Sequence, residues 1–324
     1  MNTIRRLLCV VRECDDRAVA LLRHADALAR SLQAELTLLN VLPELDPTLR
    51  LMPHAPPFSK LAEDRRTQRS GALTQLARQA GVNAHRLRLR EGIFFIEVIR
   101  EVVQEAQDLL ITNAETAAGL RRFFSNEDLR LLRKCPCPVW LLRPERPPQP
   151  RRILVAVDCG VEYDKARSEI NRKLNRSLVQ HALALATANQ ADVHLVNAWR
   201  TLSESYASTL LSDVTAEEQE QFMGELQHLH EESMRSLLAD LAREGLEQAL
   251  SFVGPTTHVV RGEPREVVPA LARELDADLV VMGTMARTGI AGFFMGNTAE
   301  AIIDQLHCSL LALKPDGYET PIAL

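Results

Sequence analysis

A glycine-rich stretch near the end of the chain carries the residues best suited to chemistry. The apolar run 279–282 leads into Gly283, and Gly296 then precedes Asn297 and a segment with helical apolar spacing. Such a run with β-branched members is typical of a parallel strand buried on both faces. Asn297 is a favoured N-cap, and Glu300 three residues later predicts a capping box. A strand, a glycine loop and a helix N-terminus together favour a phosphate, because backbone N–H groups and the helix dipole attract anions.

This stretch resembles the nucleotide loop of universal stress proteins, whose ATP-binding members carry G-x2-G-x9-G-[S/T]. Gly283 and Gly296 match the first and third glycines, while Ala286 stands at the second and Asn297 at the Ser/Thr position. The resemblance implies ATP or AMP as the ligand, with an acidic side chain near the adenosine and strand backbone near the base. The cofactor-binding residues expected on this basis are Asp158, Ala198, Met282, Gly283, Ala286, Arg287, Gly296, Asn297 and Thr298.

Length and composition indicate a globular protein with two domains. The chain has 324 residues, of which 46% are hydrophobic and 25% charged. A single α/β unit is usually about 150 residues long, so two domains are expected, at residues 1–146 and 147–324. The sequence contains no apolar run of about 18 residues, so no membrane span is expected. We therefore expect a soluble, cytoplasmic protein.

The two halves repeat the same order of elements. RRLLCVVREC (5–14) corresponds to RRILVAVDCG (151–160), and AELTLLNVLP (34–43) to ADVHLVNAWR (191–200). Strands alternating with helical stretches, which start at Ala18 and Leu178, predict a doubly wound parallel sheet in each half. The proline-rich segment 143–152 predicts a short, extended linker. The resemblance, closest to the tandem E-type members, implies two flavodoxin/Rossmann-like sheets of order 3-2-1-4-5, with ligands at the carboxyl ends of strands 1 and 4.

The loop of the first half departs from the nucleotide-binding pattern. Counting back from the shared Arg/Lys-Pro ends, Thr112 and Ser125 stand where the second half has glycines, and Arg12 replaces the acidic residue after the first strand. Ser125 and Asp128 predict a helix cap. Because Glu115 and Asp128 would repel a polyphosphate, we expect no ATP in the first domain and a structural role for this cap.

Metal binding and catalysis are not expected. Six cysteines are present, and Cys135 and Cys137 are separated by one proline without a second matching cluster, which is a poor zinc signature. His228 and His230 face different ways on a helical stretch, while His194 falls in a strand. No nucleophile elbow, complete Walker loop or pair of catalytic carboxylates can be placed, so no catalytic residue is expected.

The two insertions that follow the second strands differ in character. Residues 202–241 predict a mobile entry followed by an amphipathic helix, whose apolar stripe consists of Leu226, Leu229, Met234 and Leu237. The equivalent segment 44–60 is rich in proline and predicts a loop.

Three functions fit these features. The first is a cytoplasmic stress-response regulator that binds a nucleotide or anion in its C-terminal domain without efficient catalysis. The second is a non-nucleotide interaction protein of the stress response, and the third is a weak ATPase. The basic first half and acidic second half would favour docking of the domains on each other, but the same difference also arises from unselected variation on solvated faces. Expected partners are unknown proteins, with an intramolecular pseudo-dimer or a homodimer, and neither nucleic acid nor a membrane.

Overall fold

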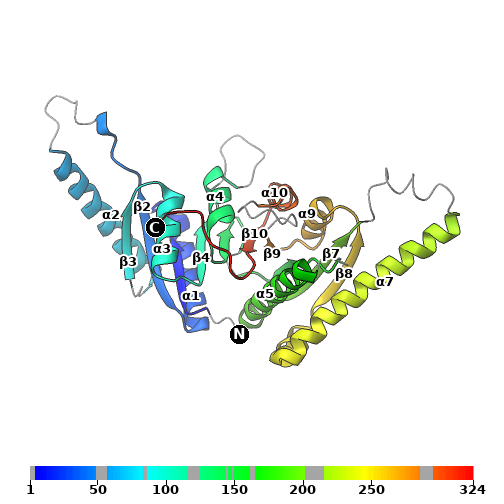
Figure 1. The fold of residues 1–324 in the computed structure, drawn as a ribbon. Coiled ribbons are helices and arrows are strands. Elements are labelled where there is room, and N and C mark those ends of the chain that lie inside the picture. The colour runs from blue at the N-terminus through cyan, green and yellow to red at the C-terminus, as the bar shows by residue number, and fades with distance from the viewer. Residues whose placement is uncertain are drawn as a thin grey trace. The chain divides into compact units, whose positions relative to one another are not determined.

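The chain forms two compact units, called unit 1 and unit 2 below. In the computed structural model, unit 1 comprises Met1–Pro148 with Glu319–Leu324, and unit 2 comprises Gln149–Tyr318. The described residues are 4–48, 57–82, 86–115, 124–143, 145–147, 149–160, 165–200, 215–284 and 295–323, with only the backbone described at 165–167. Each unit is an α/β layer structure with helices on both faces of a central sheet (Figure 1).

Unit 1 contains five parallel strands in the order β3-β2-β1-β4-β5. Its elements are β1 (Arg6–Val10), α1 (Asp16–Leu32), β2 (Glu35–Leu42), α2 (Phe58–Ala80), β3 (Arg86–Glu91), α3 (Phe94–Gln104), β4 (Leu109–Asn113), α4 (Asn126–Lys134) and β5 (Val139–Leu142). The strand order reverses between β1 and β4, as expected for a doubly wound sheet.

Unit 2 repeats this topology with the strand order β8-β7-β6-β9-β10. Its elements are β6 (Arg152–Ala156), α5 (Lys165–Asn189), β7 (Asp192–Trp199), α7 (Ala216–Leu241), the π-helical turn η2 (Ala242–Leu246), α8 (Glu247–Val253), β8 (Thr256–Arg261), α9 (Pro264–Glu274), β9 (Leu279–Gly283), α10 (Asn297–Ile303) and β10 (Ser309–Leu313). The predicted tandem fold and its strand order are confirmed.

The central strands are apolar because both faces of each sheet are covered. In β1, β4, β6 and β9 nearly every side chain is buried, including Leu7, Ile111, Val155 and Val281, each 0% exposed. Burial of one such side chain contributes roughly 1.5–3 kcal/mol, and these strands supply a continuous row of them. Polar residues are therefore concentrated at the strand ends and on the edge strands.

Edge strand β3 is joined to helix α3 by a ladder of ion pairs. Arg88 lies 2.8 Å from Glu105, and Arg90 lies 2.5 Å from Glu101, whose side chain is fully buried. Arg86 also contacts Glu105, at 3.0 Å. Because the arginines are partly exposed, each pair adds little stability, but the ladder neutralises the negative charge of the buried Glu101.

Two helix starts differ from the sequence prediction. Helix α5 begins at Lys165, more than three turns before the predicted start at Leu178, because the polar residues before Leu178 lack the apolar spacing used to find helices. Helix α2 begins at Phe58, within the segment predicted as a loop. Its N-cap, Pro57, makes no side-chain cap, so the usual polar start signal was missing.

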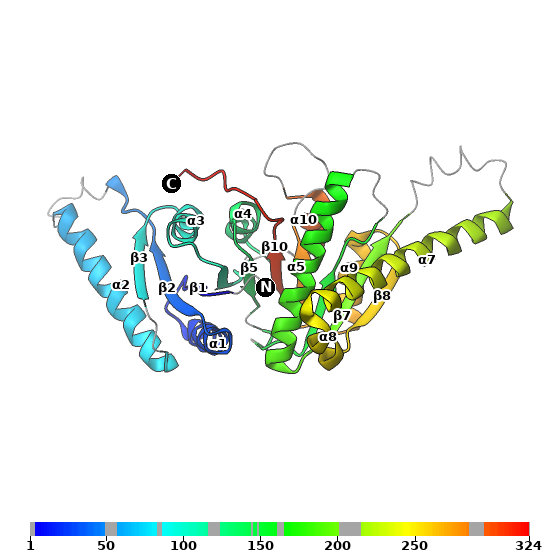
Figure 2. The ribbon, with the colours of Figure 1, turned by 60° about the horizontal axis from the view of Figure 1, so that its bottom comes forward.

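Helix α7 is longer than the strands beneath it (Figures 1 and 2). Its 26 residues span about 39 Å, whereas the eight residues of β7 span about 26 Å. Met234 and Leu237 are buried as predicted, but Leu229 is 43% exposed and does not belong to the buried stripe. Residues 202–214 of the same insertion lie outside the described residues. No helix in the described parts of the chain is long and apolar enough to cross a membrane.

Burial of His24 makes the stability of unit 1 depend on pH. The ring of His24 on α1 is 4% exposed, meets the edge of Trp140 at 5.0 Å, and has no hydrogen-bond partner among the described residues. Burial lowers the pKa of His24 from 6.5 to about 4. The unfolded chain therefore binds the proton first as the pH falls, so the free energy of unfolding decreases between pH 6.5 and 4, by about 1 kcal/mol per pH unit.

Urea unfolding of the native protein and of His24→Leu at several pH values measures this contribution. Leu fills a similar volume and cannot titrate, so the variant gains stability relative to the native protein as the pH is lowered through this range. A difference between the two proteins that stays constant from pH 7.5 to 4.5 would contradict the assignment, because titration of other groups is common to both.

Candidate functional site

Several of the predicted site residues of unit 2 lie at the carboxyl ends of the strands, where the strand order reverses. Strand β6 lies between β7 and β9, with Ala156 paired to Val196 on one side and to Met282 on the other. Asp158 follows β6 by two residues, and Ala198 lies near the carboxyl end of β7. Ligands of open α/β sheets bind at this type of position, because loops diverge there and leave a crevice.

The backbone that carries Asp158 is held by two asparagines. The Asn175 side chain accepts from the N–H of Asp158 at 3.0 Å and donates to its carbonyl at 2.8 Å. The buried Asn197 donates to the carbonyl of Val157 at 3.3 Å. These bonds fix the end of β6 and leave the Asp158 carboxylate half-buried at the site.

Sequence analysis missed both asparagines, although the internal repeat contains a signal for one of them. In unit 1, Asn40 donates to the carbonyls of Val11 and Arg12, at 2.6 and 3.1 Å. Asn40 and Asn197 occupy the same position in LLNVLP and LVNAWR. A polar residue repeated inside two otherwise apolar strands indicates a buried hydrogen bond.

Gly283 is required by packing as well as by the predicted loop. A Cβ at this position would lie 2.7 Å from Cδ2 of Leu174, on helix α5. The glycine therefore lets α5 approach the end of β9 closely. Leu174 covers part of the surface that the resemblance assigned to a ligand, so Gly283 has a structural reason to be glycine that is independent of any nucleotide.

Helix α10 begins at Asn297 with Gly296 as its N-cap, and it has no side-chain cap. The predicted capping box of Asn297 and Glu300 is therefore wrong, because Asn297 is already inside the helix. Gly296 is buried and donates its N–H to the carbonyl of Thr284 at 3.1 Å, while Asn297 and Thr298 are exposed. Ala286 and Arg287, also predicted here, lie outside the described residues.

In unit 1 the equivalent place is filled by a buried ion pair. Arg12 contacts Asp128 at the start of α4 and lies 3.1 Å from Glu115, and its guanidinium stacks on Phe94 at 4.4 Å. The Asp128 side chain is fully buried and also accepts from the N–H groups of Ser125 and Glu115, at 2.9 and 3.0 Å. The predicted cap of Ser125 and Asp128 is present as a full capping box.

Burial raises the pKa of Asp128, and the Arg12 charge and the N–H groups of Ser125 and Glu115 act against this rise. The Asp128 carboxylate is therefore bound by Arg12 and by the backbone N–H groups near the start of α4. Where sequence analysis expected Asp128 to repel a phosphate, the structure shows this carboxylate already paired with Arg12.

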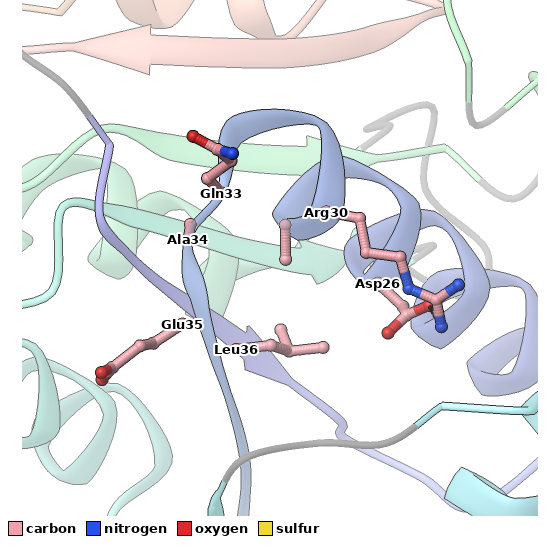
Figure 3. Close-up of a pocket in the computed structure, with 7 residues that line it drawn as sticks. Asp26, Arg30, Gln33, Ala34, Glu35 and Leu36 are labelled. Atoms are coloured by element: carbon pink, nitrogen blue, oxygen red, sulfur yellow. Dashed lines mark ion pairs between the residues drawn. The ribbon is translucent and has the colours of Figure 1, made fainter.

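A surface hollow of about 540 Å³ lies in unit 1 at the amino end of β2, at the other end of the strands from the candidate site (Figure 3). It is formed by the end of α1 and the start of β2, and the Asp26–Arg30 pair at 2.6 Å lines it. These charges neutralise each other, and the amino ends of parallel strands are not where such sheets bind ligands. Among the described residues, no group of three or more His, Cys, Asp or Glu side chains is arranged to hold a metal ion.

Comparisons with family models and with known proteins agree on one family. The model of the universal stress protein family matches residues 3–143 and again 150–314. The chain belongs to the universal stress protein family. It is 38% identical to universal stress protein E of Salmonella typhi and 37% identical to that of Escherichia coli K12, in each case over 71% of this chain and 68% of the relative. It is therefore a tandem universal stress protein of the E type, a family with a role in the stress response.

Solved structures show the same fold over nearly the full length. A protein of unknown function from Pseudomonas aeruginosa is similar with a TM-score of 0.67 and 25% identity, covering 97% of this chain and 94% of that one. A universal stress protein from Archaeoglobus fulgidus is similar with a TM-score of 0.58 and 14% identity, covering 95% and 98%. Both solved structures therefore share the α/β fold of this chain over nearly its full length.

Removing one partner of the Arg12–Asp128 pair should destabilise the protein strongly. Arg12→Ala leaves the buried Asp128 without its countercharge, and we expect a loss of about 3–5 kcal/mol in the free energy of unfolding. The double variant Arg12→Met with Asp128→Asn should lose less, because no charge stays buried and the amide oxygen can still accept from the N–H groups of Ser125 and Glu115. Arg30→Met, which breaks the exposed Asp26 pair, should cost less than about 1 kcal/mol and serves as the control in denaturant titrations.

The contact of Gly283 with Leu174 predicts a coupled pair of substitutions. Gly283→Ala should cost about 1–3 kcal/mol by overpacking. In the background of Leu174→Ala the same substitution should cost nearly nothing, giving a clear interaction energy in a double-mutant cycle. Gly224→Ala on α7, where a Cβ meets nothing within 4 Å, is the control and should not destabilise. Equal costs of Gly283→Ala in both backgrounds would refute the contact.

Proposed function

We propose that this universal stress protein is a regulatory protein that binds a nucleotide, ATP or AMP, or a similar anion in unit 2 and does not catalyse an efficient reaction. One observation supports this most strongly. Where unit 1 pairs Arg12 with Asp128, unit 2 has Asp158 at the first position and Ala299 at the second, so the same pair cannot form. The two residues that fill this place in unit 1 are therefore replaced in unit 2 by a carboxylate and a methyl group.

The chemistry of the described residues fits an adenosine better than a bare phosphate. The half-buried Asp158 carboxylate can accept from ribose hydroxyls, and it is held in place through its own backbone by Asn175. Ala198 offers strand backbone beside it for a base. The phosphates would lie toward Gly296, Asn297 and Thr298, where the start of α10 has no side-chain cap.

The remaining expectations belong to the same proposal. The two domains are residues 1–146 and 147–324; the first is degenerate and stabilises the assembly, and the protein acts in the cytoplasm. Two such domains in one chain fit an intramolecular pair. The regulator would transmit nucleotide occupancy to protein partners.

A non-nucleotide interaction protein is the second candidate, and one contact favours it. Leu174 packs on Gly283, and a methyl group at Ala286 adds bulk to the loop in the sequence motif. Both features would leave less room for a triphosphate. In that case the site would serve the packing of α5, and the function would lie on the surfaces of the two domains.

Analysis of co-purified small molecules separates the two candidates. The protein is purified without added nucleotide, denatured, and its released molecules are measured by absorbance and mass. We expect an adenine nucleotide in near-stoichiometric amount, or a thermal shift on adding millimolar Mg-ATP or AMP. An empty extract with no thermal shift would overturn the nucleotide proposal and leave the interaction protein.

Single substitutions test whether the nucleotide binds in unit 2. Asp158→Ala should weaken adenine nucleotide binding at least tenfold by removing the ribose contact, whereas Glu247→Ala, an exposed acidic residue on α8, should leave the affinity unchanged. Ala286→Gly should raise the affinity for ATP more than for AMP, because it restores the second glycine of the loop. If Asp158→Ala and Glu247→Ala bind equally well, the nucleotide is not held at the proposed place.

A further inference from the structure

Two histidines of unit 2 meet on the face of the sheet near its edge. Nδ1 of His194 on β7 lies 3.1 Å from Nε2 of His258 on edge strand β8. The two residues are 64 positions apart in sequence, and the pairing of Val196 with His258 places their side chains on the same face. Both rings are only half-buried, so solvent reaches them.

The spacing of the two nitrogens fits a pair of ligands on one metal ion. Zinc–nitrogen bonds are about 2.0–2.1 Å long, so two of them at tetrahedral or octahedral angles place the nitrogens about 2.9–3.4 Å apart. In the metal-free pair one imidazole donates and the other accepts a single proton. An ion that takes both nitrogen lone pairs replaces this shared proton.

The charges around the pair also suit a cation. Asp192 lies two residues before His194 on the same face of β7, and its charge acts directly on His194. Arg152 on the neighbouring strand opposes this, but it is bound to Asp276 at 2.8 Å. Arg152 is paired with Asp192 across the two strands, but because Asp276 also binds Arg152, the Asp192 carboxylate can compensate part of the charge of a bound ion.

Unit 1 shows that the pair is not a general requirement of this fold. Its corresponding positions hold Thr37 and Arg88, and Arg88 is engaged by Glu105 and Glu101 of α3. In unit 2 the helix position that corresponds to Glu101 holds Leu271. His258 therefore has no acidic partner from the helix above it and faces the imidazole of His194 instead.

We propose that His194 and His258 form a binding site for a divalent first-row transition-metal ion, with Zn²⁺ as the probe. Imidazole nitrogen suits Zn²⁺, Cu²⁺ and Ni²⁺ better than Mg²⁺ or Ca²⁺. The protein supplies two ligands, water completes the coordination shell, and Asp192 provides negative charge. The ion joins edge strand β8 to β7, and this site is separate from the proposed nucleotide site at the strand ends.

Calorimetric titration of the full-length protein with ZnCl₂ tests the proposal. We expect one site that is lost, or weakened at least tenfold, in His194→Gln and equally in His258→Gln, because each variant removes one of two cooperating ligands. Asp192→Asn should weaken binding less. His228→Gln is the matched control: His228 is exposed and lies 3.3 Å from Glu232, and its loss should leave the site unchanged.

Thermal unfolding provides a second test that does not depend on the measured affinity. Zn²⁺ should raise the melting temperature of the native protein and of His228→Gln, but not that of His194→Gln or His258→Gln, because only a bridged pair stabilises the folded state. MgCl₂ should have no such effect. Adventitious binding to single surface imidazoles would appear as equal, small losses in all three histidine variants without a specific thermal shift, and it would overturn the proposal.

Discussion

Coverage of both sheet faces by helices is the constraint on which the other features of this protein depend. It makes the central strands apolar throughout, so that a polar group inside them must find a partner in the chain. Asn40 and Asn197 do so by bonding the backbone where β1 and β6 end. Functional side chains are consequently restricted to the strand ends and to the edge strands. The candidate nucleotide site and the histidine pair occupy these two kinds of position.

The duplication separates two uses of the same fold. In unit 1 polar side chains are paired with each other: Arg12 with Asp128, and the arginines of β3 with the glutamates of α3. In unit 2 the corresponding positions hold Asp158, Ala299, His258 and Leu271. Unit 1 therefore has ion pairs at these positions, while unit 2 has a half-buried carboxylate and a half-buried pair of imidazoles. The two domains share topology but differ in what they can bind.

Sequence analysis recovered the topology because strand alternation and the internal repeat depend on local patterns. It also recovered the Ser125–Asp128 capping box, which is encoded within four residues. It missed what depends on distant parts of the chain, such as the Leu174 contact with Gly283 and the meeting of His194 with His258. The start of α5 was missed for a different reason, because its first turns are polar. Asp158 was predicted from its position after the first strand of unit 2, whereas the bonds of Asn175 to its backbone required the structure.

The excess length of α7 has a consequence for local stability. The last turns of α7 are held on the sheet by Met234, Leu237 and Leu241 and by the stacking of His230 on Trp199, whereas the turns before His230 depend mainly on their own hydrogen bonds and on the Thr215–Glu218 capping box. Isolated helical turns are marginal in water. Amide protons should therefore exchange fastest near Ala216 and progressively more slowly toward Leu241, so that a single helix contains a gradient of opening free energies.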